Sequence, residues 1–303
     1  MIALLTAVIG VPGAIVAVVQ IWTMVVGTAE GGGQPPASAD ELVTNSPSVP
    51  ILSPSSAPPS SAGPVAVQLS FDAFDRKDLE TGLSYTLSGW MSPTVPGSAV
   101  EILADGTVVG EGVVGQDGAV DVIVQFAVAG SAVELVARSE ATALIDDASF
   151  TIGSVDVYGW RYLSDAETTS NSKNYTTKGT WQLKGTSYDR SIAFLWSAAS
   201  FGGWRNGDAT YNLAAKCIRF VATAGVDDNA AGDEAQWSFR LAAGGREEES
   251  GFISVFNPKE LQLELRGAPR LTISATRFDP DQDQWRPYKG DAVLGNPRVL
   301  CLP

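Results

Sequence analysis

Two short segments in the C-terminal half of the chain combine aromatic rings with side chains that hydrogen-bond well to hydroxyl groups. One reads FLWSAASFGGWRNGD and the other DQDQWRPYKGD. Aromatic faces stack on the C–H surfaces of sugar rings, while Asp, Asn and Arg form paired hydrogen bonds with sugar hydroxyls. This combination predicts a carbohydrate site, whose candidate residues are Trp196, Phe201, Trp204, Arg205, Asn206, Asp208, Trp285, Arg286, Tyr288 and Asp291.

A structural role for the same aromatic residues is an equal alternative. Trp side chains are largely buried in folded proteins, so Trp196 and Trp204 can instead close one end of a hydrophobic core. The binding interpretation requires the two segments to meet at one end of their domain. Loops between strands are where binding residues most often gather.

A third segment is rich in side chains with oxygen atoms, and these side chains would suit calcium as a metal. Calcium takes six to eight oxygen ligands, so five side chains suffice only if the segment folds back on itself. The candidate ligands are Asp227, Asp228, Asn229, Asp233 and Glu234. Another acidic run, Asp279 to Asp283, has the spacing that begins an EF-hand but carries Gly290 where the bidentate Glu would be needed.

Histidine is absent from the 303 residues, and cysteine occurs twice. These absences exclude a Ser-His-Asp triad, a Cys-His dyad, histidine-ligated zinc and four-cysteine metal sites. Carboxylate chemistry is left, so a glycoside hydrolase that uses Asp227 and Asp291 is one alternative. The formal net charge of −14 disfavours nucleic acid and anionic lipid headgroups as main partners.

The pattern of apolar residues predicts how the acidic segment is held. Apolar residues alternate along residues 218–222 and again along 237–241, which predicts two half-buried strands joined by an acidic loop. Cys217 begins the first of these strands, and Cys301 lies in the last strand of the chain. If the sandwich closes by pairing those strands, the two sulfurs form a disulfide in an oxidising compartment; two free buried thiols are the alternative.

This part of the chain also resembles the NPCBM family of carbohydrate-binding modules. The motifs that carry the resemblance are YLSD at 162–165, LKGTSYDRSIAF at 183–194, ATYNL at 209–213 and RFVATAGVDD at 219–228. The resemblance implies a non-catalytic β-jelly-roll over residues 155–303, with residues 216–241 as its central hairpin. Where family members carry His after the YDRSI position, this chain has Ala-Phe-Leu at 193–195, and its last segment lacks the family's His/Asp/Trp-rich stretch.

Residues 65–152 predict a second β-domain. Their alternating apolar runs lie at 65–71, 83–89, 99–103, 108–114, 120–126, 133–138 and 148–152. Asp105-Gly106 and Asp117-Gly118 lie between runs and signal hairpins. About seven strands in this length fit an immunoglobulin-like sandwich. Residues 87–138 also resemble bacterial immunoglobulin-like repeats.

The N-terminal part is of a different kind. Residues 2–27 carry no charged side chain. As a helix they would reach roughly 39 Å, which exceeds a hydrocarbon core of about 30 Å, so they predict a single transmembrane helix. A cleaved signal peptide is the alternative, although its apolar region would be about 7 to 15 residues long and follow Lys or Arg. Residues 28–64 are rich in Pro, Ser and Gly and predict a disordered linker.

Together these elements predict an all-β protein, an immunoglobulin-like sandwich followed by a jelly-roll sandwich, tethered to the cell membrane with both domains extracytoplasmic. The expected function is non-catalytic recognition of carbohydrate, with a glycan of the cell envelope as ligand. A structural or protein-interaction role for a degenerate module is the alternative.

Overall fold

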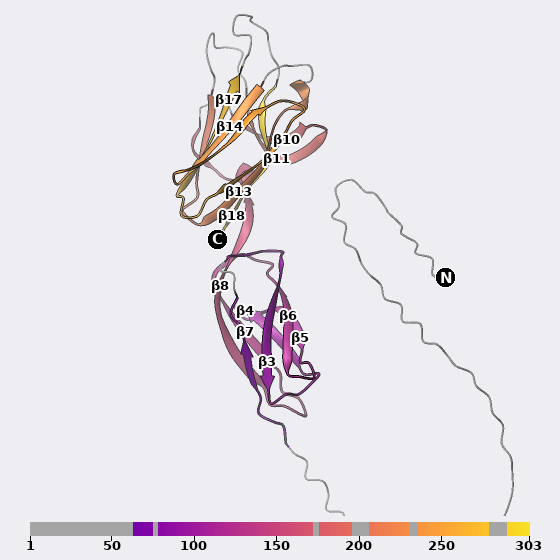
Figure 1. Ribbon diagram of the computed structural model, residues 1–303. Helices are drawn as coiled ribbons and strands as arrows, with labels where there is room; N and C mark the ends of the chain where they lie inside the picture. Colours follow the sequence, from indigo (N-terminus) through magenta and orange to yellow (C-terminus); the bar gives the residue numbers. More distant parts are fainter. Residues whose placement is uncertain (1–62, 75–77, 172–175, 196–205, 231–235, 279–289) are drawn as a thin grey trace, which may run out of the picture. The chain divides into compact units, whose positions relative to one another are not determined.

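The chain forms β-strands throughout the part that the computed structural model describes (Figure 1). The described residues are 63–74, 78–171, 176–195, 206–230, 236–278 and 290–303. Their only helical pieces are two 3-10 turns, Leu163–Asp165 and Asp228–Ala230. The all-β expectation is therefore confirmed for these ranges. The predicted anchor and nearly all of the linker lie outside them, and no helix within them is long and apolar enough to cross a membrane.

The first sandwich wraps a single core. Its strands are β1 (Gln68–Phe71), β2 (Asp78–Glu80), β3 (Ser84–Ser92), β4 (Ala99–Ala104), β5 (Thr107–Val113), β6 (Ala119–Gln125), β7 (Gly130–Ser139) and the first part of β8 (Ala148–Tyr162). They pair in the order β1-β3-β6-β5-β4-β7-β8, and Leu87, Ile102 and Leu135 lie in the core. Each expected apolar run contains a strand, and most of these strands bury one face in this core, whereas β5 has no buried side chain. The immunoglobulin-like identity stays a prediction.

Asp105-Gly106 makes the short turn that its sequence predicts. Ala104 pairs with Thr107 across it, and Asp105 and Gly106 have φ angles of 46° and 80°. A two-residue turn with positive φ at both positions matches the twist of the strands that it joins. Asp117-Gly118 lies in a longer connection between β5 and β6.

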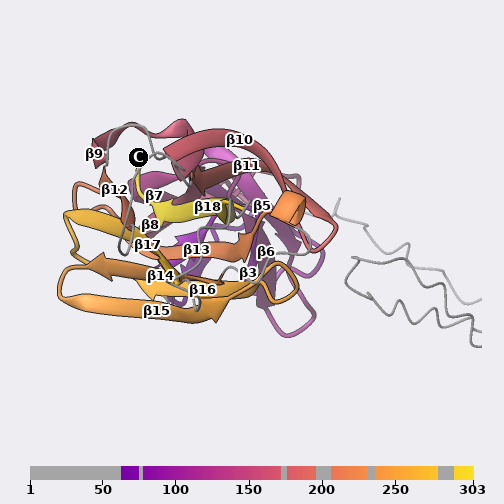
Figure 2. The same ribbon diagram turned by 90° about the horizontal axis from the view of Figure 1, so that it is seen from above.

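The second sandwich has two sheets. Its strands, beyond the end of β8, are β9 (Thr168–Asn171), β10 (Thr176–Leu183), β11 (Thr186–Phe194), β12 (Asn206–Asn212), β13 (Cys217–Val226), β14 (Gln236–Ala243), β15 (Arg246–Ile253), β16 (Lys259–Glu264), β17 (Arg270–Phe278) and β18 (Ala292–Cys301). One sheet has the order β15-β14-β17-β12-β9 (Figure 2). In the other sheet, β18 pairs with β8, β11 and β13. β11 also pairs with β10, and β13 also pairs with β16. Phe194, Phe220 and Phe239 are buried between the two sheets.

The predicted hairpin of β13 and β14 is wrong. β13 pairs with β16 and β18, whereas β14 pairs with β15 and β17 in the opposite sheet. Both strands alternate as expected, but Phe220 on β13 and Phe239 on β14 enter the same core from opposite sides. Alternation shows which face of a strand is buried and does not identify its partner.

β13 and β18 do pair, and they carry the expected disulfide. Cys217 lies opposite Cys301 in the register of these strands, and the two sulfurs are bonded. Both cysteines are buried. The disulfide is therefore confirmed, and it links residues 84 positions apart in the sequence.

β8 belongs to both sandwiches. Its residues from Ala148 to Val157 pair with β7, and those from Gly159 to Tyr162 pair with β18. The predicted passage from one domain to the next, between residues 152 and 155, thus lies within a continuous strand.

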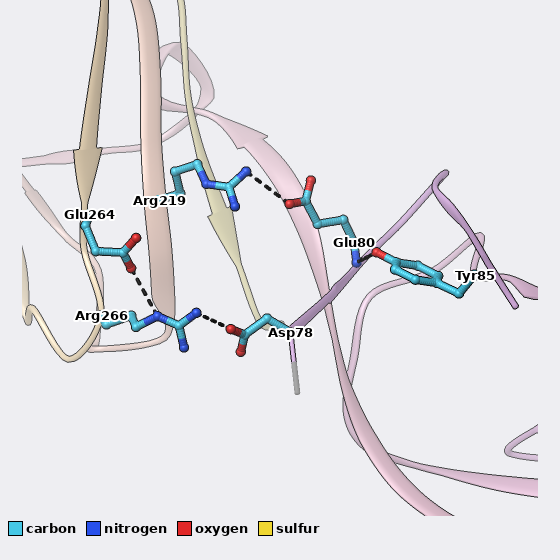
Figure 3. A network of polar contacts seen from close by, with 6 residues as sticks. All are labelled: Asp78, Glu80, Tyr85, Arg219, Glu264 and Arg266. Atoms are coloured by element: carbon cyan, nitrogen blue, oxygen red, sulfur yellow. Dashed lines mark hydrogen bonds and ion pairs between the residues drawn. The ribbon is translucent and has the colours of Figure 1, made fainter. Parts of the chain in front are cut away.

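Ion pairs accompany this shared strand (Figure 3). β2 runs parallel to β8 and presents two carboxylates to the second sandwich. Arg219 Nη1 on β13 lies 3.1 Å from Glu80 Oε1, and Arg266 donates to the carboxylate of Asp78. The hydrogen bond from Arg266 to Asp78 raises the pKa of the guanidinium. The backbone N–H of Glu80 donates to the Tyr85 hydroxyl at 2.6 Å, which fixes β2 against β3.

Candidate functional site

The strand ends that flank the predicted site segments lie together at one end of the second sandwich, here called the loop end. Trp237 joins the two sheets there, because its Nε1 donates to the carbonyl oxygen of Gly290 at 3.3 Å. The cross-strand neighbours at this end are Phe194 and Val226 with Ala292 in one sheet, and Asn206 with Thr276 and Gln236 with Phe278 in the other. Segments 196–205, 231–235 and 279–289 all start and finish here.

Most of the predicted ligand-binding residues lie outside the described residues: Trp196, Phe201, Trp204, Arg205, Trp285, Arg286 and Tyr288. For Asn206 the structure describes the backbone, in β12. Asp208 is half-buried on the same strand, and Asp291 is half-buried just before β18. The register therefore gives both segments the common end that the binding interpretation requires, while the role of each residue stays a prediction.

The core beneath the loop end is closed by Trp237 and Arg277. They are cross-strand neighbours on β14 and β17, and they are 2% and 6% exposed. Arg277 follows Leu271, Ile273 and Ala275 on the inward face of β17. Sequence reasoning missed Arg277, although the alternation of this strand was the signal that could have placed it inward.

Three of the five predicted calcium ligands are described, and all three make hydrogen bonds within the protein. The carboxylate of Asp228 accepts the N–H groups of Lys184 and Gly185, each at 2.7 Å. Asp227 is buried, and its carboxylate accepts a hydrogen bond from Asn229 Nδ2 at 2.8 Å. The described ranges hold no group of three or more His, Cys, Asp or Glu suited to a metal. Asp233 and Glu234 lie outside those ranges, so calcium stays a prediction.

The two bonds to Asp228 hold the β10–β11 turn. That turn has positive φ at Lys184 and Gly185, 50° and 77°, and its N–H groups point at the carboxylate. Next to it, Leu183 packs with Ala193 and Val293 in a small cluster outside the main core. Asp228 thus has an observed structural role, which is to clamp this hairpin to the segment after β13.

A pair of aromatic residues on the outward face of the five-stranded sheet, near the loop end, was also missed from the sequence. The rings of Phe252 on β15 and Phe278 on β17 lie 5.0 Å apart between centroids, and Phe252 is 53% exposed. Both follow strand alternation onto the outward face of the five-stranded sheet, so the sequence carried the signal. The pair stands out only once the sheet order is known, because β14 lies between the two strands.

Comparison with known families finds the NPCBM/NEW2 domain at residues 159–286. This confirms the resemblance expected for the C-terminal part, whereas the immunoglobulin-like repeat stays a prediction. Among curated proteins, no relative matches the chain.

Several solved structures of carbohydrate-binding modules are similar to the chain. The CBM51 of Clostridium perfringens GH95, in complex with methyl-galactose, is 20% identical, with a TM-score of 0.35 over 46% of this chain and 99% of that one. The M60 catalytic domain of Clostridium perfringens ZmpB with its two CBM51 domains is 13% identical, with a TM-score of 0.38 over 78% of this chain and 31% of that one.

Proposed function

We propose that the second sandwich binds carbohydrate without catalysis, through side chains presented at its loop end. The observation that carries the proposal is the register that gives segments 196–205 and 279–289 a common end. These segments supply Trp, Tyr, Arg and Asp, the residue types that stack on sugar rings and bind their hydroxyls. The NPCBM/NEW2 match over residues 159–286 supports the same function.

The charge of the chain favours an uncharged glycan as the ligand. At a formal net charge of −14, a polyanionic glycan would be repelled before it reached the site. Hydroxyl groups on a neutral sugar meet no such barrier and form hydrogen bonds with both carboxylates and guanidinium groups.

We further propose that the protein works at the cell envelope. Residues 2–27 would span the membrane and residues 28–64 would extend the two sandwiches away from it. A disulfide between Cys217 and Cys301 is compatible with an oxidising, extracytoplasmic setting. In this arrangement the protein adheres to envelope glycan.

Glycoside hydrolysis by Asp227 and Asp291 fits less well. Asp227 is 5% exposed, and its carboxylate is already bonded to Asn229. A hydrolase needs two carboxyl groups on either side of an accessible glycosidic bond.

A glycan array probed with the full chain tests the proposal. The chain is kept in a polyoxyethylene detergent, which carries no sugar headgroup that would compete. Binding to neutral glycans is expected, and folded protein that binds none of them would overturn the proposal.

The second candidate function is a protein-interaction or structural role. It is favoured by the absence of histidine, because the family's His positions are occupied by Ala193, Phe194 and Leu195. Capture of a defined envelope protein that depends on Trp204 and Trp285, and that free sugars do not displace, would support this role over sugar binding.

A further inference from the structure

The outward face of the five-stranded sheet carries a row of hydroxyl side chains beside Phe252, which is 53% exposed, and Phe278, which is half-buried. Ser238 on β14 lies opposite Thr276 on β17, and Ser274 lies two residues further along β17. All three are half-buried on the side of the sheet away from the core. Within the described ranges, these hydroxyls have no hydrogen-bond partner in the protein.

The aromatic pair borders this hydroxyl group directly. Phe252 is the cross-strand neighbour of Ser238, and Phe278 follows Thr276 by two residues on the same face of β17. The two rings are tilted by 44° to one another. From Phe278 to Ser274 the strand covers about 14 Å, which is longer than one pyranose ring.

Several other hydroxyl and charged groups on this face have partners within the protein. Thr210 and Thr272 lie 3.2 Å apart through their hydroxyl oxygens. Arg240 donates to Glu247 at 2.6 Å, and this hydrogen bond raises the pKa of the Arg240 guanidinium. On this face of the described sheet, the patch next to Phe252 and Phe278 thus joins an apolar platform to hydroxyls that have no protein partner.

We propose that Phe252, Phe278, Ser238, Ser274 and Thr276 form a second sugar subsite, the sheet-face subsite, which extends recognition from the loop end along a neutral glycan chain. The inference rests on the proposed function. Sugar rings would stack on the Phe pair, and their hydroxyls would bond to the Ser and Thr hydroxyls.

The charged side chains on the outward face of the five-stranded sheet disfavour anionic ligands. Asp208, Glu247 and Glu249 on this face outnumber Arg240 and Arg270, so phosphate and acidic sugars are disfavoured. A protein partner would also be able to cover exposed aromatic rings, but it would leave no reason for binding to depend on glycan length.

Titration with glycans of increasing length tests this subsite. The probes are the mono-, di- and trisaccharides of β-1,4-galactan, chitin and cellulose, with the full chain in a polyoxyethylene detergent. For the series that binds, the trisaccharide is expected to bind about tenfold more tightly than the monosaccharide, because a second stacked ring contributes roughly 1.4 kcal/mol.

The Phe252→Ala variant should lose this length increment and keep its affinity for the monosaccharide. Phe252→Trp should retain the increment, and Trp90→Ala is the matched control because Trp90 is 55% exposed on β3 in the first sandwich. Equal affinity for short and long glycans, or a length increment unchanged in Phe252→Ala, would overturn the subsite and leave the proposed function standing. Failure of all three series to bind would overturn the subsite, while the glycan array decides the proposed function separately.

Discussion

Tyr211 is the buried ionisable side chain whose titration the fold alters most clearly. It lies in the core of the second sandwich on β12 and is 1% exposed. Burial disfavours the phenolate and raises the pKa of Tyr211 to about 12. The residue therefore reports on the integrity of the core of the second sandwich.

The free energy of unfolding should fall between about pH 10 and pH 12. In that window the unfolded chain releases the Tyr211 proton while the folded chain keeps it, so the stabilisation is complete below pH 10 and is lost as the pH rises. The contribution is about 2 to 3 kcal/mol at most. Urea unfolding across this range should show a shallower decline in Tyr211→Phe than in the wild type, and identical declines would contradict the burial argument.

Some residues of the candidate site could be predicted from the sequence, and others could not. The loop-end residues were chosen for their chemistry, and the register of the neighbouring strands gives their segments a common end. Arg277 and the Phe252–Phe278 pair were missed because a charged residue facing inward and aromatic residues facing outward go against the usual pattern.

At the scale of elements, strand positions followed from alternation but strand partners did not. The apolar runs of the first sandwich and strands β13 and β14 of the second were predictable, because a half-buried strand repeats every two residues. The pairing of β13 with β14 was mispredicted, since residues 227–235 connect strands of opposite sheets. A two-residue turn such as Asp105-Gly106 fixes its hairpin locally, whereas a longer connection leaves the partner open.

Asp228 is expected to stabilise the β10–β11 hairpin through its two hydrogen bonds. Asp228→Asn removes the charge and one acceptor, so one N–H of the turn loses its charged partner, and the free energy of unfolding should fall by about 1 to 3 kcal/mol. Chemical denaturation measures this loss. Asp189→Asn, at an exposed position of β11, is the control for charge alone. Equal stability of the two variants would argue against the clamp.

At the scale of the whole molecule, the two sandwiches are joined by backbone and side chains together. β8 continues from one sheet system into the other, and the Glu80–Arg219 and Asp78–Arg266 pairs lie beside it. The side chain of Glu80 is 17% exposed, so this pair is better shielded from solvent than a surface ion pair.

A double-mutant cycle on Glu80 and Arg219 should therefore give a coupling energy of roughly 0.5 to 1 kcal/mol in urea unfolding. Arg240 and Glu247 form the comparison pair, within one sandwich and about half exposed, and should couple more weakly. A coupling energy of zero for Glu80 and Arg219 would show that the two sandwiches do not support one another through this contact.

The disulfide links two strands of the second sandwich that lie far apart in the sequence. Replacing both Cys217 and Cys301 by Ala should lower the free energy of unfolding by about 4 kcal/mol, because the loop that the bond closes spans 84 positions. Denaturation of the wild type with and without reductant gives the same comparison. The Ala variant should not respond to reductant, and a wild type that also ignores it would contradict this role.

The central claim is that the loop end of the second sandwich binds neutral glycan through the segments that converge there. Its most direct test is a calorimetric titration of the full chain with the glycan that it binds on the array, repeated for Trp204→Ala, Trp285→Ala and the control Trp90→Ala. We predict a loss of affinity of at least about tenfold for each of the first two variants and no change for the control. Full affinity in a folded protein that lacks both Trp204 and Trp285 would contradict the claim.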